Sequence, residues 1–182
     1  MSPPWLLGVE TSGVRGSVCL WRGDVLLESR VLSAERRHAS ELFPAIAELL
    51  SRHACRAAEL DVLCWSQGPG SFTGLRISAA LARMLMAVAG CRVVAVPTLE
   101  VIARNALRLN PRPGRLAVML DVRGGLAYAA AFNLEPDGAL DTLTPAAAGA
   151  PAEFLARIAP PFLALGAGVA PHPERRLAAR RR

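Results

Sequence analysis

Residues 5–32 read WLLGVETSGVRGSVCLWRGDVLLESRVL, and this stretch decides the fold. It holds three apolar runs, Trp5–Val9, Ser17–Trp21 and Val25–Leu32, separated by segments rich in Gly, Ser, Arg and Asp. Short apolar runs bounded by such turn residues are typical of strands joined by tight turns. We therefore predict that the chain opens with an antiparallel meander of three strands.

Helical and extended patterns alternate after this meander. Apolar residues recur on one helical face at Leu42, Ile46, Leu49 and Leu50. This spacing predicts a helix over 40–53. The other elements expected before residue 110 are strands at 61–65 and 92–96 and helices at 75–89 and 98–109. A meander followed by alternating helices and strands indicates an α/β fold with a mixed sheet.

The second half of the chain begins like the first. Asn110–Gly114 reads as a linker, after which a strand over 116–121 ends in an acid and a glycine turn leads to a strand over 126–133. A third strand at 140–143, a helix at 151–158 and a strand at 162–165 follow. This internal echo predicts two related lobes, 1–109 and a shorter 115–173, with an Arg-rich tail at 174–182.

Composition restricts the class of protein. Hydrophobic residues make up 52% and charged residues 20%, which excludes a disordered chain. The net charge is +6, but residues 174–182 supply most of it, so nothing in the body argues for nucleic-acid binding. The N-terminus lacks the basic region of a signal peptide, and the apolar stretch 78–91 is too short to span a bilayer. We expect a cytoplasmic protein that does not contact membranes.

The spacing of the cysteines and histidines indicates no metal site. The cysteines Cys19, Cys55, Cys64 and Cys91 form no CxxC pair, and the histidines are not spaced as ligands with them. Free thiols in a reducing compartment are expected. No catalytic set of Ser, His and acid is identified from the order of residues.

A glycine-rich loop, residues 66–74 (SQGPGSFTG), lies between a predicted strand and a predicted helix. Glycines let a backbone approach a ligand closely, and the free N–H groups of a helix N-terminus bind phosphates or carboxylates. The spacing matches neither a Walker nor a Rossmann loop. Anion binding and a tight strand-to-helix connection both remain open. The candidate nucleotide or anion residues are Glu10, Ser12, Gly68, Gly70, Ser71, Thr73 and Gly74.

Two acids stand at equivalent places in the two lobes. Glu10 and Asp121 each end the first strand of their lobe. Facing carboxylates at strand ends can hold a metal bound to a nucleotide, but an acid at such a place also caps its own turn. Both interpretations stay open.

The predicted helix 75–89 is apolar nearly all round. A stripe of large apolar residues is predicted at Ile77, Leu81, Met84, Leu85 and Val88, and most other positions hold alanine or methionine. A helix packed on one face of a sheet should present a polar outer side. Either the neighbouring helix 40–53 covers this one, or another polypeptide does.

Several strings together resemble one family. These strings are LGVETS at 7–12, HASELFP at 38–44, QGPGSFTGLRI at 67–77, VPTLE at 96–100, and LDVR at 120–123 with Tyr128. The chain resembles the TsaB (YeaZ) family, the bacterial non-catalytic partner in making threonylcarbamoyladenosine on tRNA. The match extends over about residues 5–170. Relatives run on for several dozen residues more.

The resemblance implies a fold and a set of partners. It implies the actin/Hsp70/sugar-kinase-like fold of two related lobes. It also implies homodimers, a heterodimer with the catalytic TsaD subunit and association with the TsaE ATPase. The complex would transfer a threonylcarbamoyl group to adenosine 37 of tRNA, with tRNA bound only indirectly by this chain.

The resemblance also assigns residues. The catalytic relative holds its metal through His-x-x-x-His, and Thr98 and Ile102 stand at those positions here. Neither side chain replaces an imidazole, which favours a supporting subunit without catalytic or metal-binding residues. The family has Asp where Glu10 stands, so ATP and magnesium are at most weak ligands. The alternative is an ATP-dependent small-molecule kinase of the same superfamily. The expected partner interface comprises Leu42, Phe43, Ile46, Arg76, Ala79, Ala80, Arg83, Met84 and Ala87.

Overall fold

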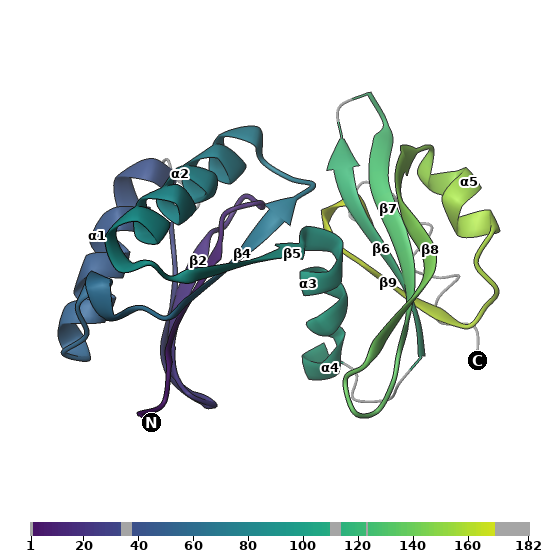
Figure 1. Ribbon diagram of the computed structural model, residues 1–182. Coiled ribbons are helices and arrows are strands. Elements are labelled where there is room, and N and C mark those ends of the chain that lie inside the picture. Colours follow the sequence, from purple (N-terminus) through teal and green to yellow (C-terminus); the bar gives the residue numbers. More distant parts are fainter. Residues whose placement is uncertain (1, 34–37, 110–113, 123, 170–182) are drawn as a thin grey trace. The chain divides into compact units, whose positions relative to one another are not determined.

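The computed structural model describes residues 2–33, 38–109, 114–122 and 124–169. The chain divides into two compact units, Met1–Pro97 and Thr98–Arg182. Each unit is built on its own sheet with helices packed against it (Figure 1).

The first unit contains the predicted meander. Its strands are β1 (Trp5–Glu10), β2 (Ser17–Arg22), β3 (Val25–Val31), β4 (Val62–Gly68) and β5 (Arg92–Pro97). They pair in the order β3-β2-β1-β4-β5. The meander pairs are antiparallel, and the β1–β4 and β4–β5 pairs are parallel. The first unit is therefore a mixed sheet, as the sequence predicts.

Two helices lie side by side on one face of this sheet (Figure 1). They are α1 (His38–Arg52) and α2 (Phe72–Ala89), and a short turn of 3₁₀ helix, η1 (Ala57–Glu59), precedes β4. Side chains alternate along a strand, so one set faces the helices. That set includes Leu7, Val9, Val18, Leu20 and Leu63, which form one core with Leu42, Leu49, Leu81 and Leu85 of the helices.

The second unit repeats the plan on a smaller scale. Its elements are α3 (Thr98–Arg104), α4 (Ala106–Leu109), β6 (Gly114–Val122), β7 (Leu126–Leu134), β8 (Leu140–Gly149), α5 (Pro151–Ala156), β9 (Phe162–Leu165) and the 3₁₀ turn η2 (Ala167–Val169). The strand order is β8-β7-β6-β9, with β6 antiparallel to β7 and parallel to β9. Thus β6, β7, β8 and β9 correspond to β1, β2, β3 and β4, which confirms the internal echo.

The boundary between the units lies after Pro97 and not at residue 109 as expected. The reason is packing, because Leu99, Ala103 and Ala106 of α3 and α4 join the core of the second sheet. The opposite face of that sheet packs on Phe154 and Leu155 of α5. The second sheet is therefore covered on both faces by its own helices. The predicted tail 174–182 lies outside the described residues.

Candidate functional site: the glycine loop and the outer face of the second helix

The carboxylate of Glu10 is bonded within its own loop. The backbone N–H of Ser12 donates to Glu10 Oε1 at 2.6 Å, and the Ser12 hydroxyl donates to the same oxygen. The hydroxyl of Ser66, at the end of β4, donates to Glu10 Oε2. Both carboxylate oxygens therefore accept hydrogen bonds that hold the first turn against the neighbouring strand.

The glycines of the loop bring two pieces of backbone together. A Cβ atom at Gly74 would collide with the carbonyl oxygen of Thr11, and one at Gly70 would collide with the backbone of Ser12. The backbone N–H of Ser71 donates to the Ser12 carbonyl at 2.7 Å. The first turn of the same chain thus occupies the space that these glycines leave free. This geometry favours the tight strand-to-helix connection over anion binding.

The rest of the loop begins the helix. The sequence predicts α2 from Leu75, but it begins at Phe72 because Ser71 caps it, its hydroxyl accepting from the N–H of Gly74 at 3.3 Å. Thr73 is an exposed residue of the first helical turn. Gly68 has a φ of +118°, a conformation that suits glycine. Ser71 and Gly74 therefore serve the helix start.

Asp121 lies in the second unit, together with Thr98 and Ile102, the positions that match the catalytic relative's metal ligands. Asp121 is exposed near the end of β6. Thr98 is buried, its Oγ1 has no hydrogen-bond partner among the described residues, and Ile102 packs against the core. Over residues 2–33, 38–109, 114–122 and 124–169, no three His, Cys, Asp or Glu side chains gather as a metal centre requires. Thr98 is therefore a buried residue and Ile102 a packed residue of the second unit.

The α2 helix has one buried and one exposed face. The residues that face the core are Gly74, Ser78, Leu81, Ala82 and Leu85. The predicted stripe is therefore wrong at Met84 and Val88, which are exposed. Thr11 explains the rotation, because its hydroxyl donates to the Gly74 carbonyl at 2.9 Å and shares a hydrogen bond with the Ser78 hydroxyl. The small residues, not the largest ones, mark the face that packs against the first turn.

The outer face of α2 is apolar and open. We use this name for the exposed residues Phe72, Thr73, Arg76, Ala80, Arg83, Met84 and Ala87. Phe72 is 74% exposed and Met84 is 45% exposed. The α1 helix lies beside α2 (Figure 1). The seven residues of the outer face are nevertheless exposed. Of the two interpretations left open by the sequence, covering of this face by helix 40–53 is therefore wrong.

Two residues of the expected interface belong to the core. Leu42 and Ile46 of α1 are buried against the sheet, so they are not available to a partner. Phe43 on the same helix is 41% exposed. Arg76, Ala80, Arg83, Met84 and Ala87 are exposed, and Ala79 is half-buried. Sequence reasoning missed Phe72, although its place beside the capping Ser71 puts it on the side opposite Gly74.

By length and composition, α2 is also apolar enough to cross a membrane, the one such helix among the described residues. Its inner face is packed in the first unit, where Leu81 and Leu85 are almost completely buried. Its outer face carries Arg76 and Arg83. A helix that packs one face in a core passes the same test of length and composition as a membrane span.

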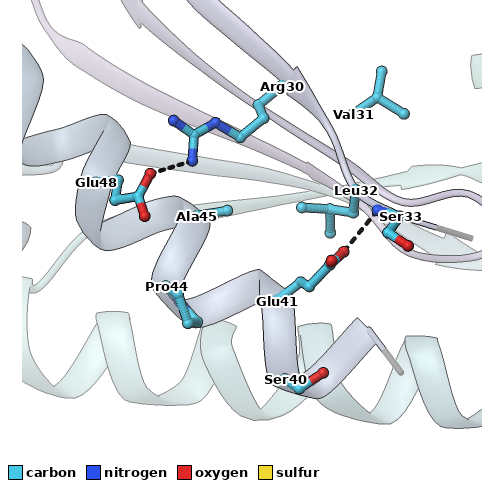
Figure 2. Close-up of a pocket in the computed structure, with 9 residues that line it drawn as sticks. All are labelled: Arg30, Val31, Leu32, Ser33, Ser40, Glu41, Pro44, Ala45 and Glu48. Carbon is cyan, nitrogen blue, oxygen red and sulfur yellow. Dashed lines mark hydrogen bonds and ion pairs between the residues drawn. The ribbon is translucent and has the colours of Figure 1, made fainter. Parts of the chain in front are cut away.

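A pocket of about 540 Å³ lies between the end of β3 and α1 (Figure 2). Arg30 donates to Glu48 at 2.6 Å across it, and the N–H of Ser33 donates to Glu41 at 2.6 Å. The hydrogen bond from Arg30 lowers the pKa of Glu48. These charged groups tie the edge strand to α1, so the pocket offers a ligand few uncommitted groups.

Comparisons with known proteins agree with this geometry. A family profile described as TsaD, tRNA N6-adenosine threonylcarbamoyltransferase, matches residues 32–165. YeaZ from Pseudomonas aeruginosa superposes with a TM-score of 0.79 at 27% identity, over 92% of this chain and 78% of that chain. An uncharacterized protein with similarity to peptidase YeaZ from Pseudomonas aeruginosa gives a TM-score of 0.75 at 28% identity, over 87% and 70% of the two chains.

Curated relatives carry the name tRNA threonylcarbamoyladenosine biosynthesis protein TsaB. The Escherichia coli (strain K12) protein is 29% identical over 133 residues, which are 73% of this chain and 57% of the relative. The Bacillus subtilis (strain 168) protein is 26% identical over 140 residues, 77% of this chain and 59% of the relative. The chain thus spans less than two thirds of the length of these relatives.

The two mixed sheets, each with its own helices, define an α/β protein of two units. Within that class, the profile covers the glycine loop, both helices of the first unit and most of the second unit. The chain belongs to the TsaB (YeaZ) family.

Proposed function

We propose that this chain is a non-catalytic subunit in the formation of threonylcarbamoyladenosine at position 37 of tRNA. In this role it binds and supports a TsaD-type transferase through the outer face of α2. The observation that carries the proposal is the exposure of Phe72 and Met84 on a helix whose other face is fully packed. Large apolar side chains exposed along one helix face support a contact with another protein.

The chemistry of these residues favours a non-catalytic subunit. Transfer chemistry needs a group that activates the acceptor or a metal that stabilises developing charge. At the positions of the relative's metal ligands this chain presents a buried hydroxyl, Thr98, and a packed alkane, Ile102. The carboxylate of Glu10 is bonded by Ser12 and Ser66. These residues hold the fold together, and the proposal assigns none of them to catalysis.

The proposal includes the remaining members of the complex. A TsaE-type ATPase joins the pair, tRNA is held by the transferase and contacted by this chain only indirectly, and the reaction takes place in the cytoplasm. Without the transferase, two copies of this chain share the outer face of α2 as a homodimer. One surface then serves both associations, so they exclude each other.

The test is co-purification with the TsaD-type subunit of the same genome. The wild-type chain should form a stoichiometric complex on size-exclusion chromatography with light scattering. The double variant Ala80→Glu, Met84→Glu places two carboxylates on the outer face of α2 and should elute separately from the transferase. Ala156→Glu, an exposed alanine on α5 of the second unit, is the matched control and should leave the complex intact.

Two results would contradict the proposal. The wild-type chain and the transferase could elute separately at micromolar concentrations of both. Alternatively, the double variant could bind as tightly as the wild type while its melting temperature is unchanged.

A further inference from the structure

The outer face of α2 has a seven-residue pattern. Arg76 and Arg83 are seven residues apart, and so are Ala80 and Ala87. Seven residues are close to two helical turns, a rise of about 10.5 Å along the axis. The two arginines therefore lie in one row and the two alanines in an adjacent row. Rows with this repeat are the contact seams of paired helices.

The alanines determine how closely a second helix can approach. Ala80 and Ala87 are exposed at the middle of the face, where larger side chains would hold a neighbouring backbone away. Phe72 lies at one end of the face and Met84 beside the alanine row, both substantially exposed. The surface is thus a row of small residues flanked by large apolar side chains. Such a surface suits the packing of a second helix better than the packing of a flat sheet.

The charges on this face have one sign. Residues 72–89 contain no Asp or Glu. The Arg76 guanidinium lies over the Phe72 ring, 5.4 Å from its centroid, and among the described residues neither Arg76 nor Arg83 forms an ion pair with a carboxylate. The exposed Glu48 of the neighbouring helix α1 is paired with Arg30.

We infer that this face is built for a partner helix that carries two carboxylates about two turns apart beside a row of small apolar residues. The inference rests on the proposed function and specifies the chemistry of the partner at the same site. The two carboxylates would pair with Arg76 and Arg83, while the small residues would seat against Ala80 and Ala87. Guanidinium–carboxylate pairs at the edge of an apolar contact fix the register of the two helices.

A second copy of the chain satisfies this face less well. In a two-fold contact between two α2 helices, Arg76 and Arg83 of both copies meet at the same seam without an acid from either helix. Like charges across an interface oppose association. The homodimer should therefore be weaker than the heterodimer, and adding the partner should dissociate it.

The experiment measures the dissociation constant for the TsaD-type subunit of the same genome by titration calorimetry at two salt concentrations. Arg76→Glu, Arg83→Glu should weaken binding at least 100-fold, and Arg83→Gln should weaken it about tenfold. Arg157→Glu, an exposed arginine on the second unit, should bind like the wild type. Reversing acids to Arg on the contacting helix of the transferase should restore binding of the double variant. All three arginine variants of this chain should melt at the wild-type temperature.

The outcomes are separable. If the wild type binds and the double variant binds equally well, the charge inference fails while the proposed function stands. If the wild type does not bind the transferase, the proposed function fails and this inference fails with it. A wild-type homodimer that is tighter than the complex with the transferase would assign the face to a second copy. Arginine-dependent binding to vesicles of phosphatidylglycerol, with no binding to the transferase, would assign it to a membrane surface.

Discussion

Thr11 is a small buried residue that determines the position of a whole helix. Its hydroxyl donates to the Gly74 carbonyl at 2.9 Å, and its own carbonyl occupies the space where a side chain at Gly74 would lie. An unpaired buried hydroxyl is expensive, so this bond holds the start of α2 at one rotation. The rotation in turn decides which residues of α2 are left exposed.

A methyl group at position 74 should disrupt this contact. Gly74→Ala forces the first turn and α2 apart and should lower the free energy of unfolding by about 2–3 kcal/mol, as overpacking does in a tight site. Chemical denaturation measures the change. Gly13→Ala is the matched control in the same turn, because a Cβ there would lie 3.6 Å from the carbonyl oxygen of Arg15, which is an ordinary contact. Equal stability of the two variants would contradict this account of the loop.

The thiols of the first unit predict a pH dependence. Burial raises the pKa of Cys55, Cys64 and Cys91, and for Cys64 the neighbouring Cys19 thiol raises the pKa further. The folded state therefore holds these protons more tightly than the unfolded state, in which the thiol pKa is about 8.5. The stability contribution is complete below that pH and is lost as the pH rises through the folded pKa values.

The measurement is the urea midpoint between pH 7.5 and pH 10. The midpoint should fall over this interval, and it should fall less in Cys64→Ala than in the wild type. A midpoint that rises with pH over the interval would contradict the prediction.

At the scale of elements, the sequence predicts which segments are helices and strands but not how α2 is turned. The spacing of Leu42, Ile46, Leu49 and Leu50 correctly predicts the buried face of α1, because the other positions of that helix are mostly polar or small. In α2 nearly every position is apolar, so hydrophobicity cannot identify the buried side. The informative residues are Gly74 and Ser78, whose partner Thr11 is 63 and 67 residues away in the chain.

The same long-range contact explains the loop. The sequence shows that Gly70 and Gly74 allow a close approach but not what approaches. The structure places the first turn there, and this neighbour depends on the parallel pairing of β1 with β4. Likewise, Leu42 and Ile46 carry the correct helical spacing for a buried face, and their assignment to the partner interface was wrong for that reason.

Two adjacent residues of α1 should separate stability from binding. Leu42 is 0% exposed, so Leu42→Ala should lower the free energy of unfolding by about 2–5 kcal/mol through the cavity it leaves. Phe43 faces outward, so Phe43→Ala should cost under about 1 kcal/mol and should weaken binding to the transferase. Thermal melting and the co-purification assay measure the two effects. A large loss of stability in Phe43→Ala with unchanged binding would place that residue in the core.

At the scale of the whole molecule, two units of related topology have different surroundings. The second sheet is covered on both faces, by α3 and α4 and by α5. In the first unit both helices lie on one face of the sheet, and the outer face of α2 remains open. The repeated pattern in the sequence predicts the topology that the two units share. It does not predict which sheet faces are covered by helices, because that depends on contacts between distant residues. The open helix face is what connects this fold to its proposed function.

The covering of α2 by a partner can be measured directly by oxidation of methionines. Met84 and Met86 are 45% and 54% exposed, whereas Met119 in the second unit is 1% exposed and serves as the internal reference. Peroxide treatment followed by mass spectrometry should oxidise Met84 and Met86 rapidly in the isolated chain. Addition of the TsaD-type subunit should protect Met84 at least tenfold, with Met119 unreactive throughout. Oxidation of Met84 at the same rate with and without a stoichiometric excess of that subunit would contradict the account.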